Sequence, residues 1–88
     1  MTTDEAAGGI SPAEAFAVLG NETRLDILRA LWEAGEPRTF AELRRTVAPD
    51  DAGNFNYHLG KLTDHFVRKT DDGYVLRYAG AALVGALV

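Results

Sequence analysis

The apolar residues of this chain recur with a helical period over most of its length and then change to an alternating pattern. Between residues 11 and 66 they return every three or four positions in four successive segments, which predicts four helices. After Phe66 the period becomes two, in Val67–Thr70 and in Tyr74–Tyr78, which predicts two strands. The turn sequence Asp71-Asp72-Gly73 lies between them, so we expect a β-hairpin.

Capping sequences set the expected bounds of the first two helices. Ser11-Pro12-Ala13-Glu14 reads as a capping box with proline at the first helical position, and its helix should direct Phe16 and Leu19 inward. Asn21 caps the second helix and Gly35 ends it. The inward stripe of this second helix is Leu25, Leu28, Leu31 and Trp32, with Ile27 beside it. We expect these residues to form the core.

The third and fourth helices are predicted to be short and close together. Glu36-Pro37-Arg38 is a turn or a short strand, and Thr39 then opens a capping box with Glu42. The inward residues of this third helix are Phe40, Leu43 and Val47. Pro49 ends it, and Asp50 or Asp51 caps a helix over residues 52–65. The stripe of that fourth helix is Phe55, Leu59, Leu62 and Phe66.

Two short helices joined by a tight turn, followed at once by a hairpin, predict a helix-turn-helix with a wing. The expected fold class is α+β (mainly α), a winged helix-turn-helix with three to four helices plus a two-stranded β-hairpin. We expect residues 1–10 to be a flexible tail, residues 11–78 the winged-helix domain, and residues 79–88 an apolar C-terminal helix.

The outer face of the fourth helix carries the candidate chemistry. Its polar side chains are Asn54, Asn56, Tyr57, Lys61 and Asp64. Amide, phenol and ammonium groups are donors and acceptors that contact base edges and phosphates in a major groove. We therefore interpret residues 52–65 as a DNA-reading helix, although an ordinary amphipathic surface helix would show the same apolar stripe.

The charge balance argues against this interpretation, and its distribution weakens the objection. The net charge is −4, whereas domains that bind nucleic acid are usually basic. Residues 1–51 hold ten acidic side chains and five arginines, but residues 52–88 hold three acids and four bases. An acidic, lysine-poor and alanine-rich chain is typical of proteins that work in concentrated salt. Salt screens phosphate attraction, so base contacts and shape would have to supply more of the binding.

Other classes of function find little support in the sequence. The chain has no cysteine, which excludes disulfides, thiolate metal sites and cysteine nucleophiles. His58 and His65 are seven residues apart, about 10 Å along a helix, so one zinc ion cannot bind both. No phosphate-binding glycine loop or nucleophile motif occurs, and we expect neither enzymatic activity nor a cofactor nor a metal. A secretory signal and an apolar run of membrane length are also missing, which predicts a cytoplasmic protein without membrane contact.

Two motifs resemble those of ArsR-like winged-helix transcriptional regulators. Leu19-Gly20-Asn21-Glu22-Thr23-Arg24-Leu25-Asp26-Ile27-Leu28 is similar to the opening pattern of that family. Asn56-Tyr57-His58-Leu59, with Leu62 three residues on, is similar to its DNA-reading helix, with Asn56 in place of the usual serine. Phe66-Val67 and Gly73-Tyr74 stand where the family has its junction to the wing and its wing tip. The resemblance covers about residues 15–78.

This resemblance implies a DNA-binding regulator of a prokaryote, with an archaeal source expected, that acts as a dimer on a two-fold operator. Metal-sensing members use cysteine-containing pairs, which this chain lacks. The candidate DNA contacts are Thr39, Arg44, Arg45, Asn54, Asn56, Tyr57, Lys61, Arg68, Lys69 and Arg77. The alternative is a winged helix used for protein contacts within a transcription or repair assembly, which the acidic balance would suit.

The register of the wing follows from separating apolar from charged residues. With Asp72-Gly73 as a two-residue loop, Arg68 opposes Arg77 and Val67 opposes Tyr78. Val67, Tyr74 and Leu76 then share one face of the hairpin, while the two arginines share the other and leave room for a phosphate between them.

The last ten residues contain no charged or hydrogen-bonding side chain. As a helix, residues 79–88 would be apolar on every side and would have to be buried. The resemblance implies a dimer interface here, with Gly80, Ala81, Gly85 and Ala86 allowing close approach. The expected contact residues are Leu83, Val84, Leu87 and Val88. Such a homodimer would present two DNA-reading helices roughly 34 Å apart, one turn of DNA. The alternative expectation for residues 79–88 is that they start a continuation of the chain.

Overall fold

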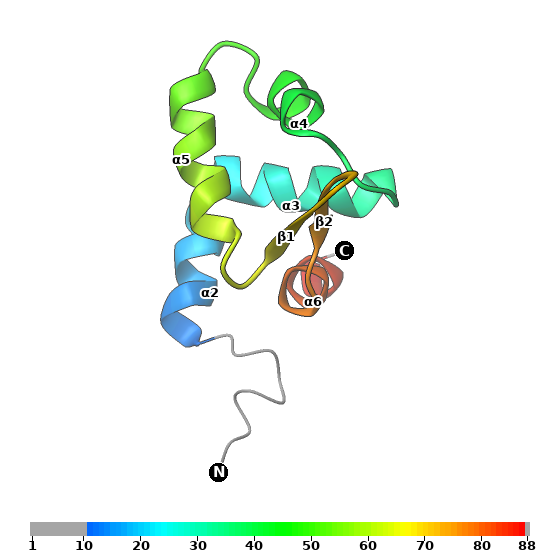
Figure 1. Ribbon diagram of the computed structural model, residues 1–88. Helices are drawn as coiled ribbons and strands as arrows, with labels where there is room; N and C mark the ends of the chain where they lie inside the picture. Colours follow the sequence, from blue (N-terminus) through cyan, green and yellow to red (C-terminus); the bar gives the residue numbers. More distant parts are fainter. Residues whose placement is uncertain (1–10, 88) are drawn as a thin grey trace.

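A central helix, α3 (Glu22–Ala34), contacts every other helix and the second strand in the computed structural model, which describes residues 11–87 (Figure 1). The other elements, in chain order, are α2 (Pro12–Leu19), α4 (Phe40–Val47), α5 (Ala52–Leu62), β1 (Val67–Thr70), β2 (Gly73–Leu76) and α6 (Tyr78–Leu87). The fold is α+β, mainly helical, with the layout of a winged helix-turn-helix. It holds the four expected helices, the hairpin and the apolar C-terminal helix.

Each predicted N-cap is present. The Ser11 hydroxyl accepts from the Glu14 backbone N–H at 3.1 Å, and the Glu14 carboxylate accepts from the Ser11 N–H at 3.1 Å. Asn21 Oδ1 accepts from the Arg24 N–H at 3.0 Å. Thr39 and Glu42 repeat the capping box on α4. Asp51, and not its neighbour, caps α5 by accepting from the Asn54 N–H at 3.3 Å. These local bonds satisfy N–H groups that have no partner inside the helix, which is why short polar side chains predict the starts so well.

The core lies between α3, α5, the hairpin and α6. Its buried side chains are Val18, Ile27, Leu28, Leu31, Leu43, Phe55, Leu59, Leu62, Phe66, Val67, Ala79 and Val84. Phe40 packs edge-on against Phe55 with ring centroids 5.3 Å apart, which joins α4 to α5. The predicted stripes of α3, α4 and α5 therefore meet in one core.

Three predicted core residues lie largely at the surface. Phe16 is 71% exposed and Leu19 38% exposed, while Val18 is the residue of α2 that enters the core. Almost every residue of α2 is apolar or alanine, so its sequence does not select one face, and the packing of α2 on α3 does. Trp32, expected in the stripe of α3, is 42% exposed. It lines a surface hollow with Pro37, Val75 and Leu76.

The hairpin forms as expected, but its register differs from the predicted one by two residues. Arg68 opposes Val75 and Val67 opposes Leu76, so the loop is Asp71-Asp72. Arg77 and Tyr78 lie beyond β2, and the predicted pairing of Arg68 with Arg77 is wrong. Side chains of a strand alternate between its two faces, so a register shift of two residues leaves each side chain on its predicted face. Val67, Tyr74 and Leu76 therefore still share a face.

A third segment explains the shift. Arg38 pairs with Tyr74 as an antiparallel bridge, with N–H···O distances of 3.1 and 2.7 Å. Gly73, at φ 135°, lies so close that a Cβ there would come within 2.6 Å of the Arg38 backbone. Gly73 is therefore part of the ladder, because this close approach requires glycine. The turn is held instead by Thr70 Oγ1, which donates to the Gly73 carbonyl at 2.9 Å and accepts from the Asp72 N–H.

The C-terminal helix is buried on one side by the chain itself. Ala79, Gly80 and Val84 are buried, and a Cβ on Gly80 would lie 2.3 Å from the Phe66 carbonyl oxygen. Val84 has no exposed surface, so the prediction that it contacts a partner is wrong. Leu83 is half-buried against the core, and Leu87 is 52% exposed. The predicted tail, residues 1–10, and Val88 lie outside the described residues.

The described helices include none that is both long enough and apolar enough to cross a membrane.

Candidate nucleic-acid interface

The outward face of α5 is centred on Tyr57. Phe55, Leu59 and Leu62 turn the opposite side of the helix into the core. Successive residues of a helix are turned by about 100° around its axis, so Gly53, Tyr57 and Gly60 lie on the side of α5 that faces away from the core. Tyr57 is 56% exposed, so a large aromatic ring with a hydroxyl stands between two glycines on an open helix face.

Neither packing nor backbone conformation within residues 11–87 requires glycine at positions 53 and 60. A Cβ at Gly53 or Gly60 would meet nothing within 4 Å, and neither residue has a positive φ. Glycine inside a helix costs about 1 kcal/mol relative to alanine, because its backbone is freer in the unfolded state. The missing side chains leave the helix backbone accessible on both sides of Tyr57. Such a surface allows another molecule to approach the backbone of α5 closely.

The polar candidates of α5 lie on both flanks of Tyr57. Helical spacing places Asn54 and Lys61 on one side and Asn56 on the other. All three are exposed. The Lys61 ammonium lies 5.6 Å from the centroid of the Tyr57 ring. The structure therefore brings together four of the predicted contact residues on one helix face.

A fifth residue joins this group from another helix. Arg24, in the first turn of α3, places its guanidinium carbon 5.9 Å from the Tyr57 ring centroid. Its Nε donates to Nδ1 of His58 at 3.0 Å. Sequence reasoning did not assign Arg24 a role, although Arg24 lies in the Leu19–Leu28 motif that carries the resemblance. Arg24 and His58 are 34 residues apart in the sequence, so residue spacing within one helix could not reveal their contact.

His58 is buried and holds Arg24 in place. Its side chain is only 8% exposed, and its Nδ1 must be unprotonated to accept from Arg24. Burial, followed by the nearby Arg24 charge, lowers the pKa of His58 below 6.5, while Asp51 acts weakly in the opposite direction. His58 is thus a buried acceptor inside the fold.

His65 fixes the other end of the same surface. Its Nε2 lies 2.8 Å from Glu14 Oε2, which ties the turn after α5 to α2. The hydrogen bond from the Ser11 backbone lowers the pKa of Glu14, and the nearby His65 lowers it further. α5 itself ends at Leu62, three residues earlier than the predicted helix, and residues 63–66 form turns.

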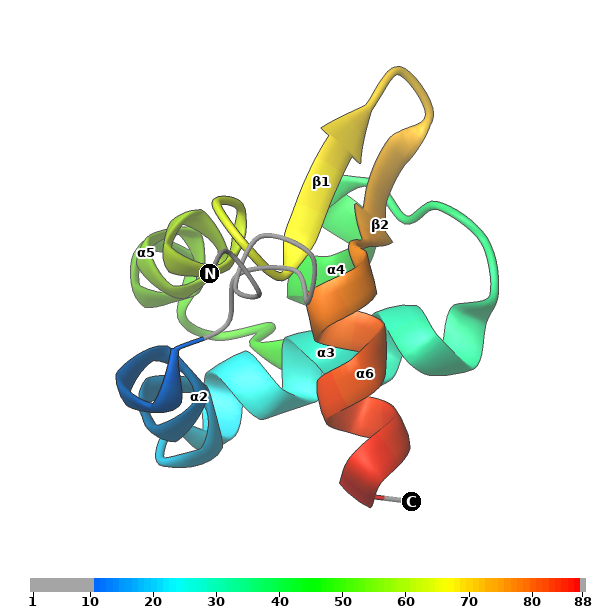
Figure 2. The same cartoon turned by 90° about the horizontal axis from the view of Figure 1, so that it is seen from below.

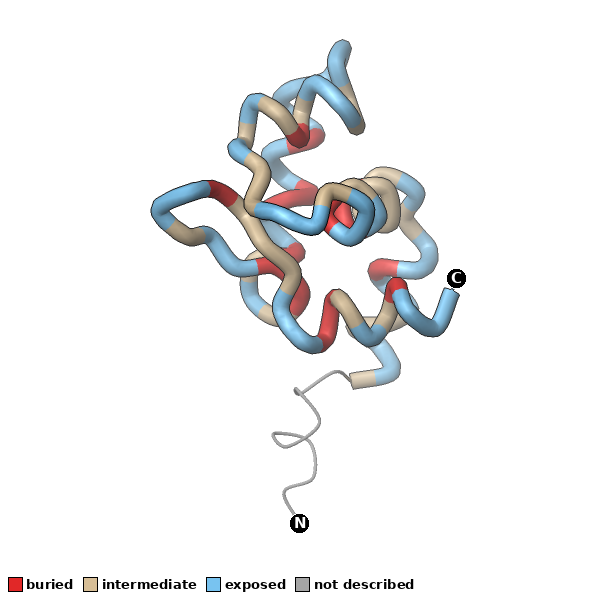
Figure 3. Tube along the Cα trace, turned by 90° about the vertical axis from the view of Figure 1, so that its right-hand side faces the viewer, coloured by how far each residue is buried: buried red, intermediate tan, exposed pale blue. Residues whose placement is uncertain are grey.

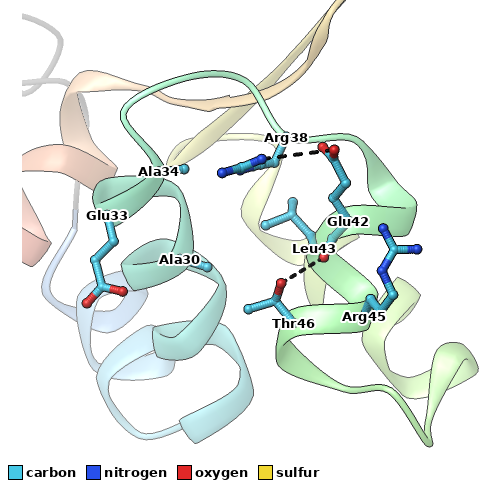
Figure 4. A pocket seen from close by; sticks show the side chains of 8 residues that line it. All are labelled: Ala30, Glu33, Ala34, Arg38, Glu42, Leu43, Arg45 and Thr46. Atoms are coloured by element: carbon cyan, nitrogen blue, oxygen red, sulfur yellow. Dashed lines mark hydrogen bonds and ion pairs between the residues drawn. The ribbon is translucent and has the colours of Figure 1, made fainter.

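The predicted contacts on α4 have different neighbours from those of Tyr57. Arg45 lines a hollow between α3 and α4 with Arg38, Glu42 and Thr46 (Figure 4). Arg44 donates to the Pro49 carbonyl at 3.2 Å and so holds the turn before α5. Thr39 is an exposed N-cap whose hydroxyl oxygen accepts from the Glu42 N–H. The neighbours of these three residues therefore belong to α4 and to the segments beside it.

The hairpin projects beyond the helices, and its turn is exposed (Figures 2 and 3). Arg68 and Lys69 are exposed neighbours in β1, so their side chains point to opposite faces of the hairpin. Arg77 is exposed between β2 and α6, and its backbone N–H donates to the Phe66 carbonyl at 2.9 Å. One face of the hairpin therefore offers Arg68 and the other Lys69.

Within residues 11–87, no three histidine, aspartate or glutamate side chains gather where they could hold a metal ion.

Residues 12–87 match the model of a family described as a domain of unknown function (DUF7347). No curated protein and no solved structure matches the chain.

Proposed function

We propose that this chain, which belongs to the DUF7347 family of domains of unknown function, is a sequence-specific DNA-binding transcriptional regulator of the ArsR-like winged-helix class. In this proposal α5 enters the major groove and the hairpin contacts the flanking backbone. The same proposal includes a cytoplasmic location and double-stranded DNA as the partner.

The observation that carries the proposal is the outward face of α5. Gly53 and Gly60 destabilise the helix without any compensating contact among residues 11–87, and they leave Tyr57 accessible between them. Asn54 and Asn56 add amides that can each donate and accept. A helix with a bare backbone and flanking amides fits the floor of a major groove, where base edges present both donors and acceptors.

The acidic balance of the whole chain is compatible with this use. Arg24 and Lys61 lie around Tyr57, and Arg68 and Lys69 lie on the hairpin. Phosphate contacts depend on local charge, whereas the net charge of −4 includes the many acids of the first half of the chain. We propose that base contacts supply a larger share of the affinity than in a basic domain.

A homodimer belongs to the same proposal. After Tyr78, the exposed positions of α6 are Ala82, Gly85, Ala86 and Leu87, and none of these four has a polar side chain. An apolar helix face left open to water favours contact with a second copy. In the corrected form of the interface, Leu87 and the half-buried Leu83 make the contact, and Val84 supports it from within the core.

The alternative is a winged helix that binds another protein, which the net negative charge favours. Gel-shift titration against genomic fragments separates the two, followed by pull-down and sequencing of the bound DNA. We expect shifts that strengthen as salt is lowered and recovered fragments that share a two-fold sequence. A protein that shifts no fragment at any salt concentration would support the protein-contact function instead.

A further inference from the structure

The two positively charged side chains beside Tyr57, Arg24 and Lys61, line a hollow between α2 and α5. It measures about 430 Å³, and Arg24, Tyr57 and Lys61 form part of its lining. The two cationic groups lie 5.9 and 5.6 Å from the same ring centroid, within the range of cation–π attraction. Two positive charges from different helices therefore lie beside the ring of Tyr57, at one edge of the α5 face.

We infer that Arg24, Tyr57 and Lys61 form a binding site for one phosphodiester group of the DNA backbone beside the groove that α5 enters. This inference rests on the proposed function and adds Arg24, a residue of α3, to the contact surface. A guanidinium, a phenol and an ammonium are all donors to phosphate oxygens.

His58 sets the direction in which Arg24 donates. The bond from Arg24 Nε to His58 Nδ1 uses one of the five N–H groups of the guanidinium. The two terminal nitrogens remain for a ligand, and their fork geometry matches a pair of phosphate oxygens. Because His58 is buried and Arg24 is half-buried, the fork is held in place before DNA arrives. His58 is therefore a positioning residue, and Arg24 is the contact.

Two acidic residues line the same hollow, and they differ in their availability. Glu14 is committed to other groups, since its oxygens accept from the Ser11 N–H and pair with His65. Asp64 is exposed at the end of the α5 face and would repel a phosphate. The site should therefore bind a phosphate with moderate strength, and removal of the Asp64 charge should strengthen it.

The experiment measures the salt dependence of binding to a fluorescently labelled duplex of mixed sequence. The phosphate contribution is independent of sequence, so such a probe reports backbone contacts alone. Each lost phosphate contact makes the slope of log K against log salt shallower by about 0.9. We expect this change for Arg24→Gln. Arg29→Gln is the matched control, because Arg29 is an exposed arginine of the same helix that lines hollows on other sides of α3. Its slope should stay at the wild-type value.

Further variants separate contact from structural support. Arg24→Lys keeps the charge and loses the fork, so it should retain most of the slope while binding more weakly than wild type. His58→Gln keeps an acceptor and should preserve the slope, whereas His58→Leu removes the acceptor and should make it shallower. Asp64→Asn should tighten binding severalfold at low salt. Thermal unfolding of each variant checks that the fold persists.

The possible outcomes are distinguishable. If wild type and all variants bind the duplex with one common salt slope, the phosphate site is refuted and the proposed function stands. If Arg24→Gln and Arg29→Gln lose the same amount of slope, the effect is one of general charge and the site is also refuted. If wild type does not bind the duplex even at low salt, both proposals fail.

Discussion

Asn56 is the amide that lies alone on its flank of Tyr57, and the proposed function gives it a base to read. Asn56→Ala should cost about 1–3 kcal/mol on the selected sequence and relax the preference at one base position. Lys61→Ala, on the opposite flank, should instead weaken all sequences evenly and flatten the salt dependence. Competition binding with the selected fragment and a scrambled duplex measures both. Wild-type affinity and wild-type discrimination in Asn56→Ala would end this assignment.

His58 should make the stability of the fold depend on pH. Its pKa in the folded state lies below the ordinary value of 6.5, so in that range the unfolded chain binds more protons than the folded one. The free energy of unfolding is therefore highest above about pH 6.5 and falls as the pH is lowered through that value. Protonation also removes the acceptor of the Arg24 hydrogen bond.

Urea denaturation at about pH 8 and about pH 5.5 tests this pH dependence. His58→Gln should show a smaller loss of stability between the two conditions than wild type. The lowered pKa values of Glu14 and Glu42 act in a separate window, below their ordinary value of 4.5. An identical loss in both proteins would show that His58 is not the group that titrates.

At the scale of single elements, α5 offers a substitution with opposite effects on stability and binding. Gly53→Ala and Gly60→Ala fill open space and should each raise the free energy of unfolding by up to about 1 kcal/mol. The added methyl groups should hold the groove floor away from the helix and weaken DNA binding about tenfold, or about 1.4 kcal/mol. If a variant is more stable than wild type and still binds DNA more weakly, loss of folding cannot be the cause of the weaker binding.

Gly85→Ala is the matched control for these two variants. Gly85 lies in α6, where a Cβ would make an ordinary contact with Trp32 at 3.5 Å. This substitution should also stabilise its helix. Because Gly85 lies on the face proposed to contact a second copy, affinity is compared on a duplex with a single half-site, where it should stay unchanged. Thermal unfolding and gel-shift titration of the three variants give the answer, and undiminished affinity in Gly53→Ala and Gly60→Ala would remove the main support for the proposed function.

At the scale of the whole molecule, the open face of α6 should hold two copies together. Leu87→Asp places a charge on an exposed position, so it should give a folded monomer. Val84→Asp would bury an unpaired charge in the core and should prevent folding, which distinguishes the outer side of α6 from its inner side. Sedimentation at micromolar concentration measures the mass of wild type and Leu87→Asp. A wild-type monomer would refute the homodimer and the expected 34 Å spacing of two α5 helices.

The sequence by itself determined the parts of this protein that depend on neighbours along the chain. Caps at Ser11, Asn21, Thr39 and Asp51 are bonds over three residues, and the stripes of α3, α4 and α5 follow from the helical period. The exposed polar side chains of α5 follow from the same period. The fold class and the position of the candidate interface were therefore predictable.

Only the tertiary structure decided the contacts between segments that lie far apart in the sequence. The hairpin register depends on Arg38 approaching Gly73, and the role of Arg24 depends on a bond to His58. The exposure of Phe16 and the burial of Val84 likewise depend on what packs against α2 and α6. A periodic pattern selects a face only where polar residues occupy the opposite one. α2 and α6 are apolar or alanine-rich nearly all round, so their orientation was determined by the shape of the core.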